Sequence, residues 1–340
     1  MLRCGIIGLG NIALNGHVPS YLHDNFIQKE IKIAAGADLI LDNCNKFKKI
    51  FPEITLYSTY EELLDNESLD FIDICTPPNT HKSIIQKAVN KGIHILCEKP
   101  IANDLDEAIE IKRLIFSRDI VFLPCHQYYF SPSWQAIKEV INKDKIGKIH
   151  FAQAQIFRIR ANEGNIHWNP SWRIEKDKSG GGILIDHGAH LMYLFTSIMG
   201  KPVKIYANVK KLLHKHYEVE DTACVILEFS DCLIEFILTW AGHSRRIVYR
   251  FLGDKGELYV GEDHISIKYR DGREEKEIFD TGMSHDSSHS LWFTPLIKLL
   301  VQRIKHKDYR KDGIEEALLC FKYISMAYES SIQGKTLSVE

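Results

Sequence analysis

The first 125 residues alternate short apolar runs with amphipathic segments of helical length, and this alternation limits the possible folds more than any other feature. Strands that are separated by helices form right-handed βαβ units, and such strands pair in parallel. The sequence therefore predicts an α/β domain with a parallel sheet over residues 1–125. The expected strands are Leu2–Ile7, Ile31–Ala37, Phe71–Cys75, Ile93–Cys97 and Ile120–Leu123.

Helix boundaries between these strands carry their own signals. Two pairs have the spacing of a capping box at a helix start: Thr59 with Glu62, and Asp104 with Glu107. Thr80 is placed to cap a helix over Lys82–Lys91, and Gly92 is placed to end it. These signals support helices between the strands.

Beyond Pro132 the apolar segments follow one another more closely. Clustered strands favour an α+β domain with an open, largely antiparallel sheet over residues 126–340. The expected strands are Ile149–Ile159, Lys204–Val209, Thr222–Glu228, Leu233–Trp240, Ile247–Leu252, Glu257–Val260 and Ile265–Tyr269. The expected helices are Ser133–Ile141, a buried helix from Gly180, Ser290–Ile304 and Ile314–Gln333. The last helix is a candidate to pack back on the first domain.

Charge and cysteine content exclude several classes of protein. The 43 Lys and Arg residues nearly balance the 45 Asp and Glu residues, and a net charge of −2 gives no support to a nucleic-acid binder with a basic surface. The first residues lack the features of a signal peptide. The nearest candidate for a membrane span, Gly180–Gly200, contains Asp186 and two histidines. With eight cysteines and no C-x-x-C pair, we expect a reduced, cytoplasmic protein with no nucleic-acid and no membrane partner.

A glycine motif at the end of the first strand predicts a dinucleotide site. Residues 8–13 read Gly-Leu-Gly-Asn-Ile-Ala and fit the G-x-G-x-x-G/A pattern of a Rossmann domain. Gly8 permits a tight turn, Gly10 lets a pyrophosphate approach the backbone, and the small Ala13 lets the helix pack on the strand. The predicted cofactor contacts are Gly8, Gly10, Asn11, Ile12 and Ala13. The alternative is a pair of turn glycines without a ligand.

Asp38, at the end of the next strand, indicates which dinucleotide binds. A carboxylate there can accept hydrogen bonds from both ribose hydroxyls, and its charge repels the 2′-phosphate of NADP. Leu39 stands where an NADP enzyme tends to offer Arg or Ser. We therefore expect NAD as the cofactor, the alternative for Asp38 being an ordinary surface carboxylate.

Two loops follow later strands at the C-terminal edge of the sheet, where ligands of doubly wound folds bind. They are Cys75–His81, read Cys-Thr-Pro-Pro-Asn-Thr-His, and Cys97-Glu98-Lys99-Pro100. A residue before proline is restricted to extended or turn conformations, so Lys99 is expected to point toward bound ligands rather than into solvent. The cofactor contacts predicted in these loops are Thr76, Pro77, Asn79, His81, Glu98 and Lys99.

Residues 180–190, read Gly-Gly-Gly-Ile-Leu-Ile-Asp-His-Gly-Ala-His, carry the strongest chemical signal. Residues four apart share a helix face, so Asp186 and His190 present a carboxylate and an imidazole together. His190 can take a hydroxyl proton while hydride leaves the carbon, and Asp186 can orient the substrate or the imidazole. The three glycines are expected to let the backbone approach a ligand. The alternatives are a structural Asp–His pair and a zinc site; no cysteine has metal spacing, and we expect no metal.

The sequence as a whole resembles the Gfo/Idh/MocA oxidoreductases, relatives of glucose–fructose oxidoreductase and inositol dehydrogenase. The resemblance covers essentially the whole chain and rests on residues 8–13, Thr76–His81, Glu98–Pro100, Trp172–Arg173, Gly180–Gly182, Asp186 with His190, and Glu329–Lys335. It implies a Rossmann domain followed by a substrate domain whose open sheet commonly mediates homodimers or homotetramers. The family's catalytic lysine, aspartate and histidine fall on Lys99, Asp186 and His190.

The resemblance also points to residues that contact substrate. An Arg that the family often has near Tyr129 is missing from the run Cys125–Phe130. A polar, aromatic loop supplies Arg158, Arg160, Asn162, Trp168, Trp172 and Arg173, and its alternative is a solvated surface strip. The predicted substrate contacts are His126, Tyr128, Arg158, Trp172, Arg173 and His187.

These features predict an NAD-dependent oxidoreductase that transfers hydride between the nicotinamide and a secondary hydroxyl or ketone of a sugar, cyclitol or sugar derivative. Three alternatives stay open at this point. One is a ketoreductase or dehydrogenase for nucleotide sugars or sugar phosphates, one is an NAD-dependent glycosidase, and one is a non-catalytic NAD-sensing regulator.

Overall fold

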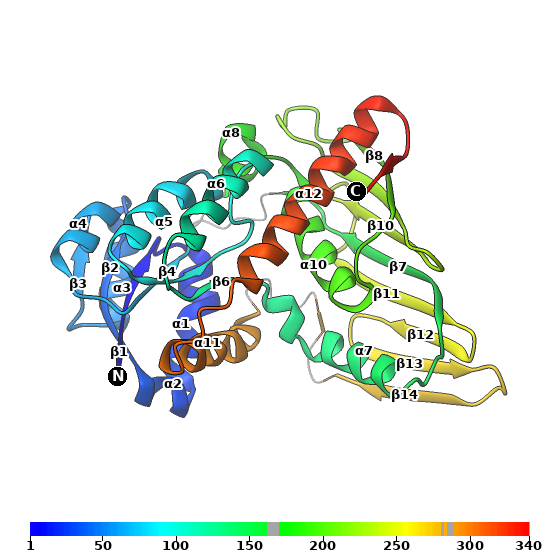
Figure 1. Cartoon of the computed structure of the whole chain (residues 1–340), viewed down its shortest axis with the longest axis horizontal. Helices are drawn as coiled ribbons and strands as arrows, with labels where there is room; N and C mark the ends of the chain where they lie inside the picture. The colour runs from blue at the N-terminus through cyan, green and yellow to red at the C-terminus, as the bar shows by residue number, and fades with distance from the viewer. Residues whose placement is uncertain (162–169, 280–281, 284–288, 340) are drawn as a thin grey trace. The chain divides into compact units, whose positions relative to one another are not determined.

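The computed structural model describes residues 1–161, 170–279, 282–283 and 289–339. The chain divides into two compact units, shown in Figure 1. Unit 1 comprises Met1–Gln127 and Ser288–Leu319, and unit 2 comprises Tyr128–Ser287 and Cys320–Glu340. The chain therefore returns to unit 1 with Ser288–Leu319 before it ends in unit 2.

Unit 1 is built on a six-stranded sheet in the order β3-β2-β1-β4-β5-β6, with every neighbouring pair parallel. This order confirms the predicted Rossmann architecture, in which the chain reverses direction across the sheet next to β1. The strands are β1 (Leu2–Ile7), β2 (Ile31–Ala37), β3 (Thr55–Tyr57), β4 (Phe71–Ile74), β5 (His94–Cys97) and β6 (Phe122–Pro124). The prediction missed β3 because its three residues are too few to show a hydrophobic pattern.

The helical turn that follows the glycine motif is wider than an α-helix. It is the π-helix η1 (Ala13–His17), and it continues into α1 (Val18–His23) and α2 (Asn25–Glu30). The other helices and helical turns of this unit are α3 (Leu41–Ile50), α4 (Tyr60–Asn66), η2 (Pro78–Thr80), α5 (His81–Asn90), α6 (Leu105–Phe116) and α11 (Ser290–Lys305). π-Helical turns are rare, and those that occur are often found at functional sites.

Helix starts in unit 1 follow the predicted capping chemistry in two of three cases. The backbone N–H of Glu62 donates to Thr59 Oγ1 at 3.2 Å, and that of Glu107 donates to Asp104 Oδ1 at 2.8 Å. The prediction for Thr80 was wrong, since its hydroxyl donates instead to the carbonyl of Pro77 at 2.8 Å. That bond closes the loop before α5 rather than capping the helix.

Unit 2 is built on a mixed nine-stranded sheet in the order β14-β13-β12-β11-β7-β10-β9-β8-β15. Only the central pair β7–β10 is parallel among its neighbouring strands, which confirms the predicted open and largely antiparallel sheet. The strands are β7 (Ile149–Phe157), β8 (Lys204–Lys210), β9 (Thr222–Glu228), β10 (Leu233–Thr239), β11 (Arg246–Gly253), β12 (Gly256–Val260), β13 (His264–Tyr269), β14 (Glu274–Ile278) and β15 (Leu337–Ser338). The prediction missed β14, whose five residues are all exposed and mostly charged.

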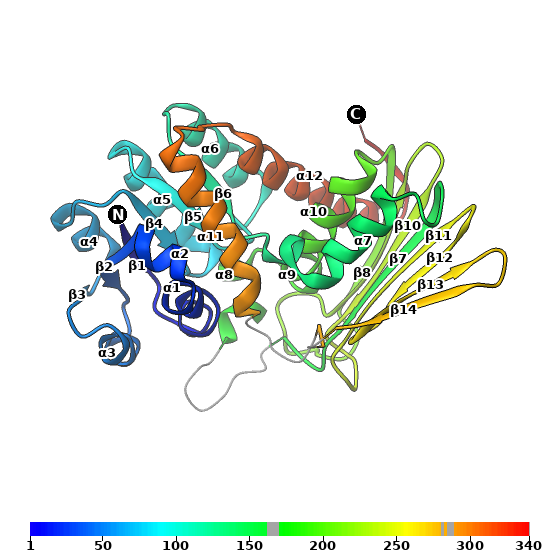
Figure 2. The same ribbon diagram turned by 90° about the horizontal axis from the view of Figure 1, so that it is seen from below.

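Helices cover one face of this sheet, as Figure 2 shows for α7 (Pro132–Asn142) and α10 (Gly188–Met199). Phe195 of α10 stacks on Phe251 of β11 at 5.5 Å and packs edge-on against Phe236 of β10 at 5.0 Å. The remaining helical elements are η3 (Gln127–Phe130), η4 (Ser171–Ile174), α8 (Lys176–Ser179), α9 (Ile183–Asp186) and α12 (Asp312–Gln333). Among the described residues, no helix has the length and apolar character that crossing a membrane requires.

Candidate functional site

The glycine motif forms a tight turn with room for a ligand at its second glycine. Gly8 has φ +87°, and a Cβ added there would lie 2.8 Å from the carbonyl carbon of Cys75. Gly8 is therefore required by the packing of the turn against the end of β4. At Gly10, in contrast, no atom of the described residues lies within 4 Å of an added Cβ. The absence of a side chain at Gly10 thus leaves open space of the kind that a pyrophosphate needs.

Asp38 is fixed beside this turn. Its carboxylate accepts hydrogen bonds from the backbone N–H of Leu9 at 2.7 Å and from the backbone N–H of Ile40 at 2.7 Å. The Asn43 side chain donates to the same carboxylate at 3.0 Å. Leu39 is 86% exposed, so an apolar surface adjoins the carboxylate. A carboxylate offers about four acceptor positions, so Asp38 keeps capacity for a ribose hydroxyl, and these residues fit a dinucleotide.

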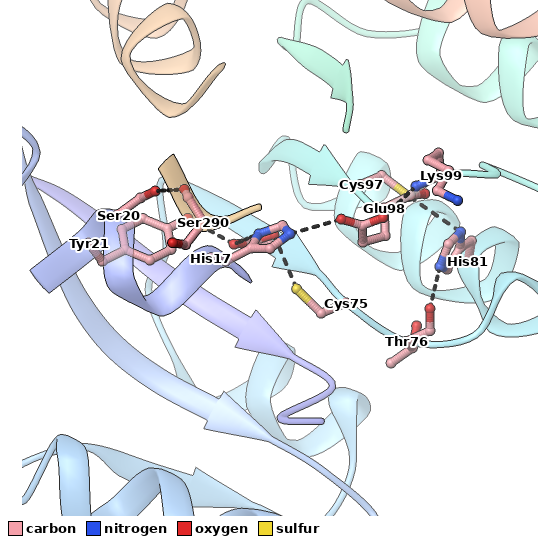
Figure 3. Close-up of polar contacts among 11 residues, drawn as sticks. His17, Ser20, Tyr21, Cys75, Thr76, His81, Cys97, Glu98, Lys99 and Ser290 are labelled. Atoms are coloured by element: carbon pink, nitrogen blue, oxygen red, sulfur yellow. Dashed lines mark hydrogen bonds and ion pairs between the residues drawn. The ribbon is translucent and has the colours of Figure 1, made fainter. Parts of the chain in front are cut away.

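The loop between β4 and α5 is shaped by a buried histidine. His81 is fully buried; its Nε2 lies 2.9 Å from the carbonyl oxygen of Thr76, and its Nδ1 lies 3.5 Å from Cys97 Sγ (Figure 3). Burial lowers the pKa of His81. His81 therefore holds the loop from inside, whereas Asn79 is exposed and Thr76 is half-buried.

Lys99 follows β5, and the carboxylate before it faces the interior of unit 1. Glu98 is 6% exposed; its Oε1 lies 2.9 Å from His17 Nε2, and its Oε2 accepts from the backbone N–H of Lys99 at 3.1 Å (Figure 3). Glu98 was predicted as a cofactor contact, and the structure gives this carboxylate two partners within the protein. Lys99 itself is half-buried.

Two further members of this cluster, His17 and Asp73, were not predicted from the sequence. His17 Nδ1 lies 2.8 Å from Asp73 Oδ2, and the Tyr21 hydroxyl donates to the same oxygen at 2.9 Å. One signal was present in the sequence: Asp73 is a charged residue inside the apolar strand Phe71–Ile74, where a side chain is expected to be buried. The histidine gave no signal of its own.

His126, a predicted substrate contact, belongs to unit 1 and is buried. Burial and the positive charge of Lys99 lower the pKa of His126 to about 3. The imidazole is therefore neutral at physiological pH. A neutral ring beside an ammonium can accept or donate a hydrogen bond without adding positive charge.

In unit 2, the glycine triplet serves packing within the protein. Glu220 accepts hydrogen bonds from the backbone N–H of Gly182 at 2.9 Å and of Leu184 at 3.0 Å, and from the Tyr328 hydroxyl at 2.7 Å. A Cβ on Gly182 would collide with the backbone oxygen of Glu220, and one on Gly181 would collide with the Tyr328 hydroxyl. The glycines were expected to let the backbone approach a ligand. At Gly181 and Gly182 the space beside the backbone is filled by Tyr328 and Glu220 instead.

Asp186 and His190 lie on consecutive short helices. Asp186 ends α9, His187 forms the junction, and His190 lies in the first turn of α10. His187 Nδ1 lies 3.1 Å from Asp186 Oδ2, although the two residues are adjacent in sequence. His190 is 3% exposed, and its ring packs on Tyr128 with centroids 4.2 Å apart. The structure thus brings Tyr128 and His190 together, as well as Asp186 and His187.

The other predicted substrate residues lie in different surroundings. Arg158 is buried, and its guanidinium donates to the carbonyls of Phe157 at 2.9 Å and Arg246 at 3.3 Å. Those bonds support the end of β7, which is a structural role. Trp172 and Arg173 lie in η4, with the guanidinium 5.5 Å from the indole ring centre. Asn162 and Trp168 lie outside the described residues.

Two groups of buried side chains among the described residues have the spacing of metal ligands. They are His17 with Asp73 and Cys75, and His17 with Glu98 and Cys125. Both ring nitrogens of His17 lie within hydrogen-bond distance of carboxylates, and burial raises the pKa of the Cys75 thiol to about 12. Hydrogen bonding therefore accounts for these contacts, and the expectation of no metal stays a prediction.

Known proteins match both halves of the chain. The oxidoreductase family with an NAD-binding Rossmann fold matches residues 2–124, and the GFO/IDH/MocA C-terminal domain matches residues 134–259. An uncharacterised oxidoreductase of Schizosaccharomyces pombe is 26% identical over 74% of this chain and 69% of its own length. A myo-inositol 2-dehydrogenase of Thermotoga maritima is 24% identical over 76% of this chain and 75% of its own length. Across curated relatives, the matched part spans 49% to 79% of the relative.

A solved structure supports the same fold. An oxidoreductase from Agrobacterium radiobacter in complex with NAD+, L-tartaric acid and magnesium superposes with a TM-score of 0.84 at 18% identity, over 99% of this chain and 98% of that one. The parallel sheet, the glycine turn with Asp38, and the two matched domains in this order identify the chain. It belongs to the Gfo/Idh/MocA family and is an oxidoreductase with an NAD-binding Rossmann domain.

Proposed function

We propose that this oxidoreductase moves hydride between NAD and the carbon that bears a secondary hydroxyl of a sugar, cyclitol or sugar derivative. The observation that carries the proposal is the group around α10, where His190 packs on Tyr128 and Asp186 lies 3.1 Å from His187. An imidazole and a carboxylate one turn apart suit the exchange of a hydroxyl proton. The Thermotoga maritima relative is named for a cyclitol, which supports this substrate class.

The cofactor side of the proposal rests on the glycine turn. The backbone at Gly10 would bind the pyrophosphate, and Asp38 would accept a hydrogen bond from the adenosine ribose. When bound, the nicotinamide accepts or returns the hydride. Asp38 carries a charge that disfavours a 2′-phosphate, and its hydrogen bonds to the backbone of Leu9 and Ile40 hold that charge in place. We therefore expect NAD to be used in preference to NADP.

Each candidate catalytic residue has one role. His190 takes the hydroxyl proton during oxidation and returns it during reduction. Lys99 donates a hydrogen bond to the reacting oxygen and stabilises the charge that develops on it. Asp186 holds the substrate and the neighbouring imidazole in register. Because His126 is neutral with a pKa of about 3, it adds no second positive charge near Lys99.

The test measures NADH absorbance across a panel of sugars, inositols, sugar phosphates and nucleotide sugars, with NAD and NADP in parallel. On the best substrate, Lys99→Met and His190→Ala should each lower turnover by at least about 100-fold while NAD affinity is retained. Lys49→Met, a substitution of an exposed lysine in unit 1, is the matched control and should leave turnover unchanged. Undiminished turnover in both catalytic variants would refute the roles, and faster turnover with NADP would refute the role of Asp38.

The same substrate panel distinguishes an enzyme for free sugars from the alternative, a ketoreductase or dehydrogenase for nucleotide sugars or sugar phosphates. Phosphate groups would suit the arginines Arg158, Arg160 and Arg173, but the guanidinium of Arg158 donates to backbone carbonyls instead. We therefore do not advance it. A preference for sugar phosphates or nucleotide sugars over free sugars in the panel would reinstate it.

We also propose that the chain forms a homodimer or homotetramer through the outer face of the nine-stranded sheet. Three apolar side chains on that face are exposed: Tyr206 by 38%, Ile226 by 40% and Leu233 by 46%. Adjacent exposed apolar side chains on a sheet favour an interface. Light scattering coupled to gel filtration tests this proposal, and a monomer at micromolar concentration would refute it. The cytoplasmic location stays a prediction from the sequence.

A further inference from the structure

The cluster behind Lys99 joins three charged side chains from three elements of unit 1. His17 ends the π-helix η1, Asp73 lies in β4, and Glu98 follows β5. All three are buried, with 0%, 0% and 6% of their surface exposed. Charged side chains are almost never buried to this extent unless they are paired. These three side chains pair with one another inside the unit.

The hydrogen-bond geometry sets the protonation of His17. Nδ1 lies 2.8 Å from Asp73 Oδ2, and Nε2 lies 2.9 Å from Glu98 Oε1. If both carboxylates are ionised, they only accept hydrogen bonds, and both ring nitrogens then carry protons as in an imidazolium. Burial lowers the pKa of His17, but Asp73 and Cys75 together raise it by more, and the pKa lies well above its usual value.

The surroundings of the ring support the same assignment. The Phe293 ring of α11 packs against it with centroids 4.1 Å apart, which excludes water from that side. The Tyr21 hydroxyl donates to Asp73 at 2.9 Å, and Cys75 Sγ lies 3.5 Å from the other oxygen of Asp73. Other titratable groups near the cluster are His81, whose pKa burial lowers, and the thiols of Cys4, Cys97 and Cys125, whose pKa values burial raises well above normal. These thiols therefore stay protonated and add no negative charge beside His17.

We propose that His17 is a positioning residue that fixes the backbone at Lys99 through Glu98. One oxygen of Glu98 binds His17, and the other accepts the backbone N–H of Lys99 at 3.1 Å (Figure 3). The imidazolium thereby links the helix after the glycine turn to the turn that carries the proposed catalytic lysine. Its effect on turnover rests on the proposed function, whereas its effect on the Lys99 backbone does not.

The test compares His17→Gln with His23→Gln, a substitution of an exposed histidine at the end of α1. In the wild-type protein labelled with ¹⁵N-histidine, both ring nitrogens of His17 should show imidazolium shifts at pH 8. In His17→Gln, hydrogen exchange of the Lys99 amide should accelerate by about tenfold or more, because its acceptor is no longer held. In His23→Gln that exchange rate should not change.

Kinetics provide a second readout when a substrate is known. Misplacement of Lys99 should lower kcat in His17→Gln by about tenfold or more, as small displacements of catalytic groups do. The KM for NAD should change by less than about threefold, because Gly10 and Asp38 are untouched. Glu98→Gln, which keeps the shape of the side chain but supplies one acceptor instead of two, should show the same pattern.

The outcomes separate this inference from the proposed function. Accelerated exchange at Lys99 without activity on any substrate supports the inference and counts against the function. An unchanged exchange rate in a folded His17→Gln variant, a ring nitrogen without a proton, or stoichiometric zinc in the isolated protein would overturn the inference. If His17→Gln fails to fold, His17→Gln/Asp73→Asn, which removes one buried charge of each sign, takes its place in the same measurement.

Discussion

In each unit a glutamate carboxylate accepts backbone N–H groups near a candidate catalytic residue, but the other partners of the two carboxylates differ. In unit 1, buried Glu98 accepts the N–H of Lys99 and is balanced by the His17 imidazole. In unit 2, half-buried Glu220 accepts the N–H groups of Gly182 and Leu184 at the start of the helix that ends at Asp186. The first carboxylate is compensated by a charged partner, and the second by neutral donors.

The two settings shift protonation differently. Unit 1 stabilises a charged histidine, because a buried carboxylate without a positive partner is costly. In unit 2, burial raises the pKa of Glu220 above its usual 4.5, although its hydrogen bonds act in the opposite direction. The two supports should respond differently to mutation and to pH.

The largest expected difference concerns two glycines, one in each unit. Gly182→Ala places a methyl group against the backbone oxygen of Glu220, so the free energy of unfolding should fall by about 3 kcal/mol or more. Gly10→Ala places its methyl group in open space, so stability should change by less than about 0.5 kcal/mol. Urea denaturation measures both.

A second measurement completes this comparison. Gly10→Ala should weaken NAD binding, measured by calorimetry, because the methyl group occupies the space assigned to the pyrophosphate. Unaltered NAD affinity in this variant would remove the assignment of Gly10 to the cofactor site. Unaltered stability in Gly182→Ala would remove the close packing of Glu220 against the glycine triplet.

The features that could be predicted from the sequence are local ones. The glycine turn, Asp38 and the capping residues Thr59 and Asp104 depend on neighbours within a few positions, and a short pattern is enough to recognise them. The Rossmann architecture follows from the same kind of regularity, repeated along the chain. A resemblance in the order of several motifs then assigned candidate roles to distant residues such as Lys99 and His190.

The features that could not be predicted are long-range pairings of single polar residues. His17 meets partners 56 and 81 positions away, and Glu220 meets Gly182 38 positions away. No local pattern specifies such contacts, because they depend on which strands become neighbours. Arg158 illustrates the opposite case: its charge suggested a ligand, whereas its guanidinium binds the carbonyl of Arg246, 88 positions away.

The second expected difference lies in the pH dependence of stability. Glu220 and His17 both have raised pKa values, so the folded state binds more protons than the unfolded state in each case. Their stabilising contributions are therefore present at low pH and are lost as pH rises, from about 4.5 upward for Glu220 and from about 6.5 upward for His17. A difference of one pKa unit between the folded and unfolded states corresponds to about 1.4 kcal/mol in the free energy of unfolding.

Urea midpoints from pH 4 to pH 9 at constant ionic strength separate the two windows. Glu220→Gln should flatten the decline that begins near pH 4.5 and leave the decline above pH 6.5 in place. His17→Gln should flatten the decline above pH 6.5 and leave the decline that begins near pH 4.5 in place. A decline above pH 6.5 that persists unchanged in His17→Gln would mean that another group titrates there.

The smallest expected difference concerns two tyrosines that donate to carboxylates. Tyr328 donates to Glu220 at 2.7 Å, and Tyr21 donates to Asp73 at 2.9 Å. Tyr328→Phe removes one of three neutral donors and should lower the free energy of unfolding by about 1.5 kcal/mol, within the range for hydrogen bonds to charged groups. Tyr21→Phe should cost less, about 1 kcal/mol, because the His17 imidazolium still compensates Asp73. Matched urea titrations at pH 7 measure both variants, and a larger loss in Tyr21→Phe would show that the hydroxyl, rather than the imidazolium, carries the support of Asp73.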